Sequence, residues 1–585
     1  MIAAQALVPA PVVVPLAVAA ILLAIGHIVP ARVSDITAIV VALFVAVVCG
    51  YLAVASRAEP LVYWFGGWKP TANAVLGIGF RVDPASAAIA TFVAFLFTTT
   101  YVYAWGFFEQ VRHVFHVISL VFLAALEGFC LTGDLFDLFV WFEVMSVAAF
   151  ALTAYQLQTS SISGALNFTV TNSLASIVML TGVGLVYGVT GSLNFAEIGR
   201  LAPIEGVRGA VLLGGFCLLA LALLTKAAIV PMHFWLSDAH AVAPSPVSVV
   251  FSGAMVPIGL FAFAKISVQM FGGRPDIVAM FPAPLMALGC LTLVVGAAAA
   301  WQQRHLKRML AFSTISHMGA MLVGLASLTS VGLAGQVAYL VGHGLVKAAL
   351  FMLVGILPAT RASVDELDLR GLGGDLWPAG LATAAAGLLL AGAPLGILHG
   401  GTELVGGAAE PLADGGVKAA MIFAAAVTGG SVLRAAGRVY LGWGPDPGPE
   451  ANAPSAIEQE SANRPLWLML MPALVLLAAD LTPASWIEAA ARASVPALAG
   501  PAGARALASG AMPAGGLPHW TGMILAVLVA GWALGRDRLP AAVVRGGDLL
   551  TRPFSRALGA VHSGILADYV VWMMVGLALL AAFAI

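Results

Sequence analysis

Glu143 and Lys226 are ionisable residues placed in apolar stretches of the sequence. Glu143 lies in LFDLFVWFEVMSVAAF, and Lys226 lies in LALLTKAAIV. A charged side chain is costly inside a lipid bilayer, so such residues are candidates for function. If their helices touch, a proton or cation that arrives at one group changes the charge of the other. The alternative is a static ion pair that holds two helices together.

His343 and Lys347 form a second candidate group, in YLVGHGLVKAALF. Residues four apart share one face of a helix, and an imidazole changes its charge near neutral pH. The two side chains are therefore suited to relay protons along a hydrated path. The alternative is a hydrogen-bonded core histidine beside a lysine that extends to the membrane surface, but Lys347 lies near the middle of its apolar run.

Two weaker candidates are Glu127 and Lys265. Glu127, in FLAALEGFC, is expected to be either a second acidic site or the partner of a neighbouring subunit. Lys265 lies toward the end of its apolar run and could instead extend to the membrane surface. Asp134 stands just before an apolar run, where a carboxylate favours capping of the helix.

Polar residues also follow Lys226, at His233, Asp238 and His240. Their spacing superficially suggests a metal site, but polar groups that close a proton inlet explain them as well, and we expect no metal. Glu403 is expected at the extracytoplasmic mouth or just inside it.

The element that must position Lys226 is a broken helix. Pro231 follows Lys226 by five residues, and a proline inside a helix removes a backbone hydrogen bond and clashes one turn back. In hydrocarbon, freed backbone groups and an ammonium are tolerated only beside protein or a water-lined cavity. The stretch 221–250 therefore predicts an interrupted transmembrane helix that carries a buried amine.

Composition predicts an all-α polytopic membrane protein. Of the 585 residues, 61% are hydrophobic and only 9% are charged, whereas soluble domains carry about 25% charged residues. The net charge of −1 argues against nucleic-acid binding. The four cysteines lie far apart and form no CxxC pair, so neither an iron–sulfur cluster nor any other cofactor is expected.

About sixteen apolar runs are long enough to cross a membrane. They suggest four regions: N-terminal spans and an extracytoplasmic loop (1–112), two five-span repeats (113–270 and 283–441), and a linker with C-terminal spans (442–585). Residues 58–83 are expected to form a loop or short hairpin, and 488–517 a loosely ordered stretch. The predicted runs fall at roughly 11–29, 35–54, 84–106, 113–132, 135–157, 164–189, 208–231, 244–270, 283–301, 308–328, 332–357, 377–398, 415–441, 465–482, 518–534 and 562–585.

The two repeats are predicted to be inverted copies of each other. Gly392 and Pro394 interrupt the run LLLAGAPLGILHGGTEL, as Pro231 interrupts 208–231. Paired interruptions in two halves are typical of inverted repeats with a site at mid-membrane. Lysine and arginine are enriched in one set of alternate loops, including the segment 536–556, which places that set in the cytoplasm and both termini outside.

Four long motifs then resemble one family, in that family's order. They are GDLFDLFVWFEVM, LLTKAAIVPMHFWLSDAHAVAPSPVS, WQQRHLKRMLAFSTISHMG and HGLVKAALFMLVG. They are similar to the proton-translocating antiporter-like subunits of Mrp-type cation/proton antiporters, complex I and membrane-bound hydrogenases. FGGW at 65–68 looks more like the Mrp and hydrogenase branches, and 558–578 resembles the last span of sixteen-helix members.

The resemblance implies two inverted five-helix repeats with broken seventh and twelfth helices around a polar axis. It assigns ion translocation to Glu143, Lys226 and Lys307, and a relay to His343 and Lys347. Two positions depart from the family pattern. Pro257 replaces a lysine that many members carry on their eighth helix, where Lys265 could substitute. In PLGILHGGTE the family's lysine position falls near Gly401 or Thr402, so His399 or Glu403 could serve instead.

These observations favour a multi-pass subunit of the inner (plasma) membrane that moves protons, alone or in exchange for Na⁺ or K⁺. One alternative is the proton-pumping subunit of a redox complex, of the hydrogenase or NADH:quinone oxidoreductase type, with electrons confined to partner subunits. Another is a degenerate assembly subunit, which the departure at 401–402 would favour. Each of them implies other membrane subunits as partners.

Overall fold

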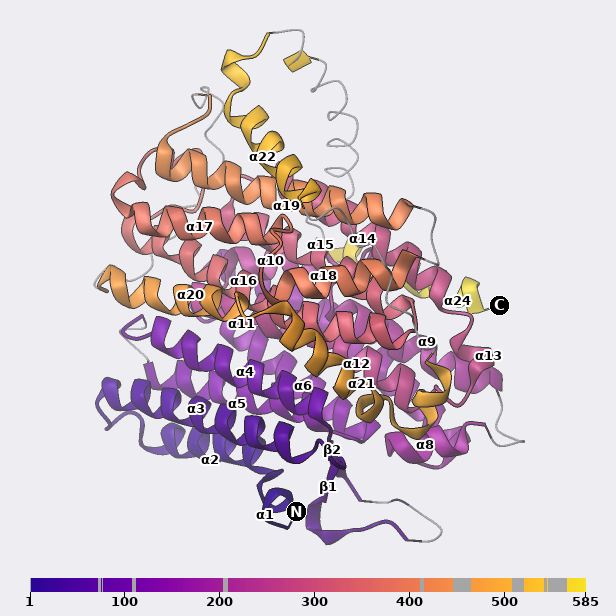
Figure 1. The fold of residues 1–585 in the computed structure, drawn as a ribbon. Coiled ribbons are helices and arrows are strands. Elements are labelled where there is room, and N and C mark those ends of the chain that lie inside the picture. Colours follow the sequence, from indigo (N-terminus) through magenta and orange to yellow (C-terminus); the bar gives the residue numbers. More distant parts are fainter. Residues whose placement is uncertain are drawn as a thin grey trace.

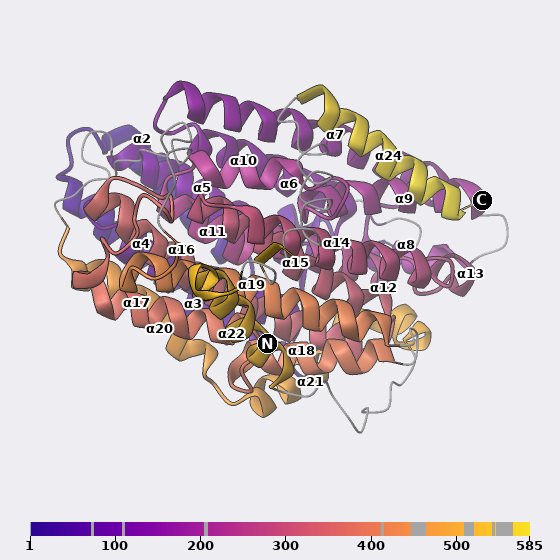
Figure 2. The ribbon, with the colours of Figure 1, turned by 90° about the horizontal axis from the view of Figure 1, so that it is seen from above.

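The computed structural model is a bundle of helices that mostly run side by side (Figures 1 and 2). Twelve helices of the described part are long and apolar enough to cross a membrane, or thirteen if one bent pair counts as a span. The predicted all-α polytopic class is confirmed, whereas the count of sixteen stays a prediction. The structure describes residues 2–71, 75, 77–107, 112–203, 209–410, 415–445, 464–507, 520–540, 544–545 and 566–584.

The centre of the bundle is formed by the span Ser245–Gln269 and by the helices α15 (Leu306–Ala326) and α16 (Ser330–Arg361). Nearly all of their residues are buried. Large apolar side chains on α2, α3 and α7, such as Ile21, Leu43 and Ile177, are more than two-fifths exposed, as expected for a surface that faces lipid. Charged residues on the central helices are therefore enclosed by protein.

The N-terminal part ends in a small hairpin. The strands β1 and β2 pair antiparallel, with Leu61 opposite Val82, so the hairpin predicted within 58–83 is confirmed. Asp83 then caps α4, and Asp134 caps α6 by accepting from the backbone amides of Phe136 and Asp137. The elements are α1 (Ile2–Leu7), α2 (Ala10–Ile25), α3 (Ala31–Ala55), β1 (Leu61–Trp64), β2 (Gly79–Val82), α4 (Pro84–Tyr103), α5 (Arg112–Leu131), α6 (Leu135–Thr153), α7 (Thr159–Thr190) and α8 (Phe195–Leu201).

The next part contains the first interrupted helix. After α9 the chain makes an irregular turn and continues as α10, so the predicted break near Pro231 is confirmed. A π-helical turn, Phe251–Met255, precedes Pro257 within one long span, and a wider turn leaves room for the proline ring. The elements are α9 (Gly209–Lys226), α10 (Phe234–Val242), α11 (Ser245–Val250), α12 (Val256–Gln269), α13 (Pro275–Val278), α14 (Pro282–Gln302), α15 (Leu306–Ala326) and α16 (Ser330–Arg361).

The second interrupted helix is formed by α17 and α18. Gly392, in the break, and Gly396, the first residue of α18, both have positive φ, where glycine meets no steric penalty. An interruption therefore recurs in each predicted repeat; the repeat boundaries themselves stay predictions. The remaining elements are α17 (Trp377–Leu390), α18 (Gly396–Ala409), α19 (Gly416–Leu441), α20 (Leu466–Asp480), α21 (Ala484–Ala506), α22 (Thr521–Leu534) and α24 (Leu566–Ala584).

The C-terminal region differs from expectation in one stretch. Residues 488–506, expected to be loosely ordered, belong to α21, which is bent at Gly500. The alanine-rich sequence favours helix, and Val495 and Leu498 are buried. Of the linker expected at 445–463, residues 446–463 lie outside the described residues, as does most of 536–556. The last helix, α24, lies beside α7 and α9 at the edge of the bundle (Figure 2).

Candidate functional site

The break between α9 and α10 is held by side chains that bind its free backbone groups. The indole nitrogen of Trp235 donates to the carbonyl of Thr225 at 2.9 Å. The hydroxyl of Thr292 accepts from the amide of Val230 at 3.2 Å. Unsatisfied backbone groups inside a membrane cost several kcal/mol each, so these contacts make the interruption tolerable. They also fix the end of α9, where Lys226 lies.

Lys226 is fully buried and has partners on two other helices. Its Nζ donates to Ser146 Oγ on α6 at 2.8 Å and to Asn172 Oδ1 on α7 at 3.4 Å. The ammonium also lies 4.8 Å from the centre of the Phe142 ring. Lys226 is the last residue of α9, where the helix dipole favours a cation. The buried amine is thus held by neutral polar groups, an aromatic face and a helix end.

Glu143 lies on α6, three residues before Ser146, and is partly exposed. Its charge and that of Lys226 act on each other. Among the described residues, however, Glu143 and Lys226 form no direct ion pair. The two predicted residues therefore lie close enough for their charges to interact, but they do not form a direct ion pair.

Lys307 and Lys347 are also fully buried and bind backbone carbonyls. Lys307, in the first turn of α15, donates to the carbonyl of Ala243 at 3.1 Å. Ala243 ends α10, so this short helix connects the region of Lys226 with Lys307. Lys347, on α16, donates to the carbonyl of Leu310 at 2.7 Å and to the hydroxyl of Ser313.

His343 lies beside a second histidine that the sequence interpretation did not single out. The rings of His343 and His317 are 5.0 Å apart. His317 Nδ1 forms a 2.6 Å hydrogen bond with the hydroxyl of Tyr339, and its Nε2 lies 3.3 Å from the hydroxyl of Thr428. We call the buried groups around Lys226, Lys307, Lys347 and His343 the polar line. His317, Tyr339 and Thr428 extend this line from α16 through α15 to α19.

Not every predicted residue joins this line. Glu127 is buried against Cys49, whose thiol donates to the carboxylate at 3.4 Å. Lys265 does not reach the surface: it is buried and donates to the carbonyls of Cys130 and Thr132 at the end of α5, at 2.9 and 2.8 Å. The two residues thus have local partners away from Lys226.

The departure from the family pattern at 401–402 has a steric counterpart. A Cβ atom at Gly401 would lie 2.5 Å from the backbone nitrogen of Tyr339, so no side chain fits there without movement. His399 and Glu403, on the same helix α18, are half-buried. Their predicted role in translocation stays a prediction.

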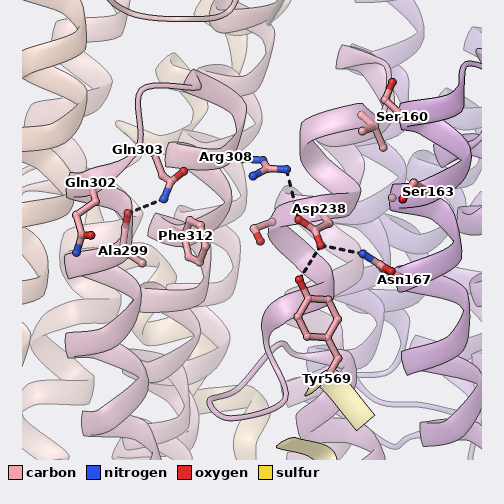
Figure 3. A pocket seen from close by; sticks show the side chains of 13 residues that line it. Ser160, Ser163, Asn167, Asp238, Ala299, Gln302, Gln303, Arg308, Phe312 and Tyr569 are labelled. Carbon is pink, nitrogen blue, oxygen red and sulfur yellow. Dashed lines mark hydrogen bonds and ion pairs between the residues drawn. The ribbon is translucent and has the colours of Figure 1, made fainter. Parts of the chain in front are cut away.

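His233, Asp238 and His240 form no metal site in the described part of the chain. His240 is fully buried, and its ring stacks on Phe351 at 4.6 Å. Lys307 and Lys347 both act electrostatically on it. Asp238 instead lines a polar cavity (Figure 3).

Sequence reasoning located most charged members of the line but few of their neutral partners. Ser146, Asn172 and Tyr339 carried no clear signal, because neutral polar side chains in an apolar run are less conspicuous than charged ones. His317 did carry one, since an imidazole stands in the middle of the apolar run 308–328.

Interrupted helices and buried lysines and histidines define a polytopic membrane protein with ionisable groups in its interior. Residues 132–399 match the family model described as "NADH:quinone oxidoreductase/Mrp antiporter, TM". The match covers less than half of the chain, and this region, 132–399, belongs to the antiporter-like subunit family.

Relatives named for two different assemblies share this region. The chain is 32% identical over 306 residues to an NADH-quinone oxidoreductase subunit of Desulforudis audaxviator, covering 51% of this chain and 59% of that protein. It is 32% identical over 272 residues to a Na(+)/H(+) antiporter subunit of Alkalihalophilus pseudofirmus, covering 46% and 52%. The matches span little more than half the length of these relatives.

Solved structures share the fold over more of the chain. A chain of the membrane-bound sulfane sulfur reductase, an archaeal respiratory membrane complex, aligns with a TM-score of 0.73 and 23% identity over 86% of this chain and 99% of that chain. A chain of the Mrp complex from Dietzia sp. DQ12-45-1b aligns with a TM-score of 0.67 and 22% identity over 98% and 100%.

Proposed function

We propose that this chain is an ion-translocating membrane subunit that moves protons, alone or in exchange for Na⁺ or K⁺. The observation that carries the proposal is the fully buried Lys226, held at a helix break between Ser146 and Asn172 and within the electric field of Glu143. An amine that is buried in this way can take up and release a proton while its side chain stays in the protein interior.

In this proposal Glu143 and Lys226 act as a switch. When the carboxylate is charged and close, it stabilises the protonated amine. When Glu143 moves away or takes up a proton, that stabilisation is lost and Lys226 releases its proton. The proton then passes by way of Lys307, Lys347 and His343, which lie on the following elements of the polar line.

A second candidate is a proton-pumping subunit of a redox complex. One relative is named as a subunit of NADH-quinone oxidoreductase, and one solved structure is a respiratory reductase. Under this proposal electrons stay in partner subunits, and a conformational change drives the same residues. A degenerate assembly subunit is the third candidate, which the close packing of Gly401 on Tyr339 favours.

Partners and orientation belong to the same proposal. Relatives and structural neighbours are named as subunits of larger assemblies, so we infer that other membrane subunits surround this chain. The enrichment of lysine and arginine in one set of loops favours both termini on the extracytoplasmic side of the plasma membrane.

The proposal is tested in inside-out vesicles that contain the complete assembly, with a fluorescent pH probe. Glu143→Gln and Lys226→Ala are each expected to slow proton movement by about tenfold or more. Glu410→Gln, at an exposed residue, serves as the control and should leave the rate unchanged. Undiminished movement in both variants, at normal protein levels, would remove the pair from the mechanism. Dependence of the rate on added Na⁺ or K⁺, or on a redox substrate, separates the first two candidates.

A further inference from the structure

A polar cavity of about 490 Å³ lies between α7, α10, α14, α15 and α24 (Figure 3). Its rim includes the exposed residues Ser160 and Ser163, and its inner wall includes Ser237, which is 5% exposed. The rim lies at the start of α7 and the end of α14, next to Arg304 in the loop before α15 and Arg308 in the first turn of α15. Such arginine-bearing loops favour the cytoplasmic side.

Asp238 is the carboxylate of this cavity, and three donors hold it. Tyr569 Oη donates to Oδ2 at 2.9 Å, and Asn167 Nδ2 donates to the same oxygen at 3.1 Å. The guanidinium of Arg308 lies 3.5 Å from Oδ1. The nearby guanidinium disfavours binding of a metal cation at this carboxylate. The chemistry of the cavity therefore fits water and protons.

The cavity is separated from Lys226 by one aromatic layer. Asn167, at the cavity, and Asn172, which binds Lys226, are five residues apart on α7, or about 7.5 Å along its axis. Between them Phe168 stacks on Trp235 with ring centres 4.6 Å apart and planes at 8°. Trp235 also donates to the carbonyl of Thr225, the neighbour of Lys226. The Phe168 ring lies 5.8 Å from Lys226 Nζ, and its neighbour Asn167 lines the cavity.

The C-terminal helix α24 packs against the segment that carries Trp235. The ring of Tyr569 stacks on Phe234, the neighbour of Trp235, at 5.1 Å and 7°. Further along α24, Gly576 packs against Met232. One tyrosine therefore both binds the carboxylate of the cavity and covers the segment that carries Trp235.

We propose that the Asp238 cavity is the proton-uptake site for Lys226 and that Tyr569 of α24 closes it. This inference rests on the proposed transport function. In the closed state Tyr569 occupies one oxygen of Asp238 and holds Phe234 and Trp235 in place. When α24 shifts, Asp238 binds water at that oxygen, Trp235 is released, and a proton passes from the cavity to Lys226.

The first measurement is chemical access to the cavity, which does not depend on transport. Ser237→Cys is introduced together with Cys290→Ser, because Cys290 is the half-buried native cysteine and the other three are buried. The complete assembly in inside-out vesicles is treated with a charged, membrane-impermeant maleimide. Tyr569→Ala should raise the labelling rate by about tenfold, and Tyr569→Phe, which keeps the ring stack, should raise it less. Tyr187→Ala, at an exposed tyrosine of α7, is the matched control and should not change it.

The second measurement is proton movement in the same vesicles. Asp238→Asn, which preserves shape, should slow it by about tenfold, and Asp238→Glu should restore part of the rate. Labelling of Ser237→Cys should block it. The proposal is overturned if Tyr569→Ala leaves the labelling rate unchanged, or if complete labelling and Asp238→Asn leave proton movement intact.

The two proposals fail in different ways. If Lys226→Ala stops proton movement but Asp238→Asn does not, the uptake site is wrong and the transport function stands. If Lys226→Ala has no effect, the proposed role of Lys226 in transport fails, and the uptake site for Lys226 fails with it.

Discussion

At the scale of single residues, the structure explains how an amine is kept inside the bundle without a direct counter-ion. Transferring an ammonium into hydrocarbon is costly, but neutral hydrogen-bond acceptors and a helix end reduce that cost. Lys226 has both, in Ser146, Asn172 and the end of α9. Because these partners are neutral, the charge on Lys226 remains sensitive to the state of Glu143. A tight ion pair would couple the two charges more strongly and hold the amine protonated for as long as Glu143 stays ionised.

Ser146→Ala should destabilise the protein through loss of its bond to Lys226. A hydrogen bond to a charged group contributes about 1.5–3 kcal/mol. Ser267→Ala is the matched control. Like Ser146, Ser267 is buried, and its hydroxyl donates to the carbonyl four residues earlier. Among the described residues, no lysine donates to Ser267. Thermal unfolding of the purified assembly in detergent should show a clear fall in Tm for Ser146→Ala and a smaller one for Ser267→Ala. Equal shifts would mean that the bond to Lys226 contributes nothing to stability.

The charged members of the polar line could be predicted because their cost in a membrane makes them conspicuous in the sequence. Lys226, His343 and Lys347 were found in this way. The partners of a lysine could not be found, because a carbonyl has no sequence signature. Lys265 illustrates the point: nothing in its own run indicates that it binds the end of α5.

At the scale of elements, the two interrupted helices are completed by groups from distant parts of the chain. The carboxylate of Asp480, at the end of α20, accepts from the amide of Leu398 in the first turn of α18 at 3.1 Å. The first amides of a helix have no partner within the helix itself. A residue of the C-terminal region thus caps a helix of the second predicted repeat.

Asp480→Ala should therefore weaken the start of α18. Loss of a helix cap costs about 0.5–2 kcal/mol. Asp480→Asn retains a side-chain oxygen that can accept from Leu398 and should lose less. The measurement is the rate of limited proteolysis or hydrogen exchange at 396–409. If segment 396–409 is protected equally in Asp480→Ala, Asp480→Asn and the wild-type protein, the cap is unimportant.

The positions of both breaks followed from proline and glycine, whose backbone effects are local. Their caps did not follow, because 82 residues separate Asp480 from Leu398. The helix α21 was missed for a related reason. Its alanine, glycine and proline content suggested a loose stretch, but burial against α12 and α16 stabilises the helix, and tertiary packing overrides composition.

At the scale of the whole molecule, composition and hydropathy predicted the class of fold, and solved structures share that fold with TM-scores of 0.73 and 0.67. The way in which the ends of the helices are tied together was not predictable. Glu366, in the loop after α16, is 1% exposed and pairs with Arg434 and Arg438 of α19. Arg434 also donates to the carbonyls of Trp301 and Gln303 at the end of α14, at 2.6 and 3.0 Å.

This buried triad should be a major connection between α14, α16 and α19. Glu366→Gln would leave two arginines without their carboxylate, and breaking a buried ion pair costs about 3–5 kcal/mol. Asp375→Asn is the matched control, because its pair with Arg361 involves a side chain that is 65% exposed, and exposed pairs contribute about 0–1 kcal/mol. Thermal unfolding of the assembly should show a large loss for Glu366→Gln and little for Asp375→Asn. Similar Tm values for the two variants would contradict the role of the triad, since only burial distinguishes the carboxylates.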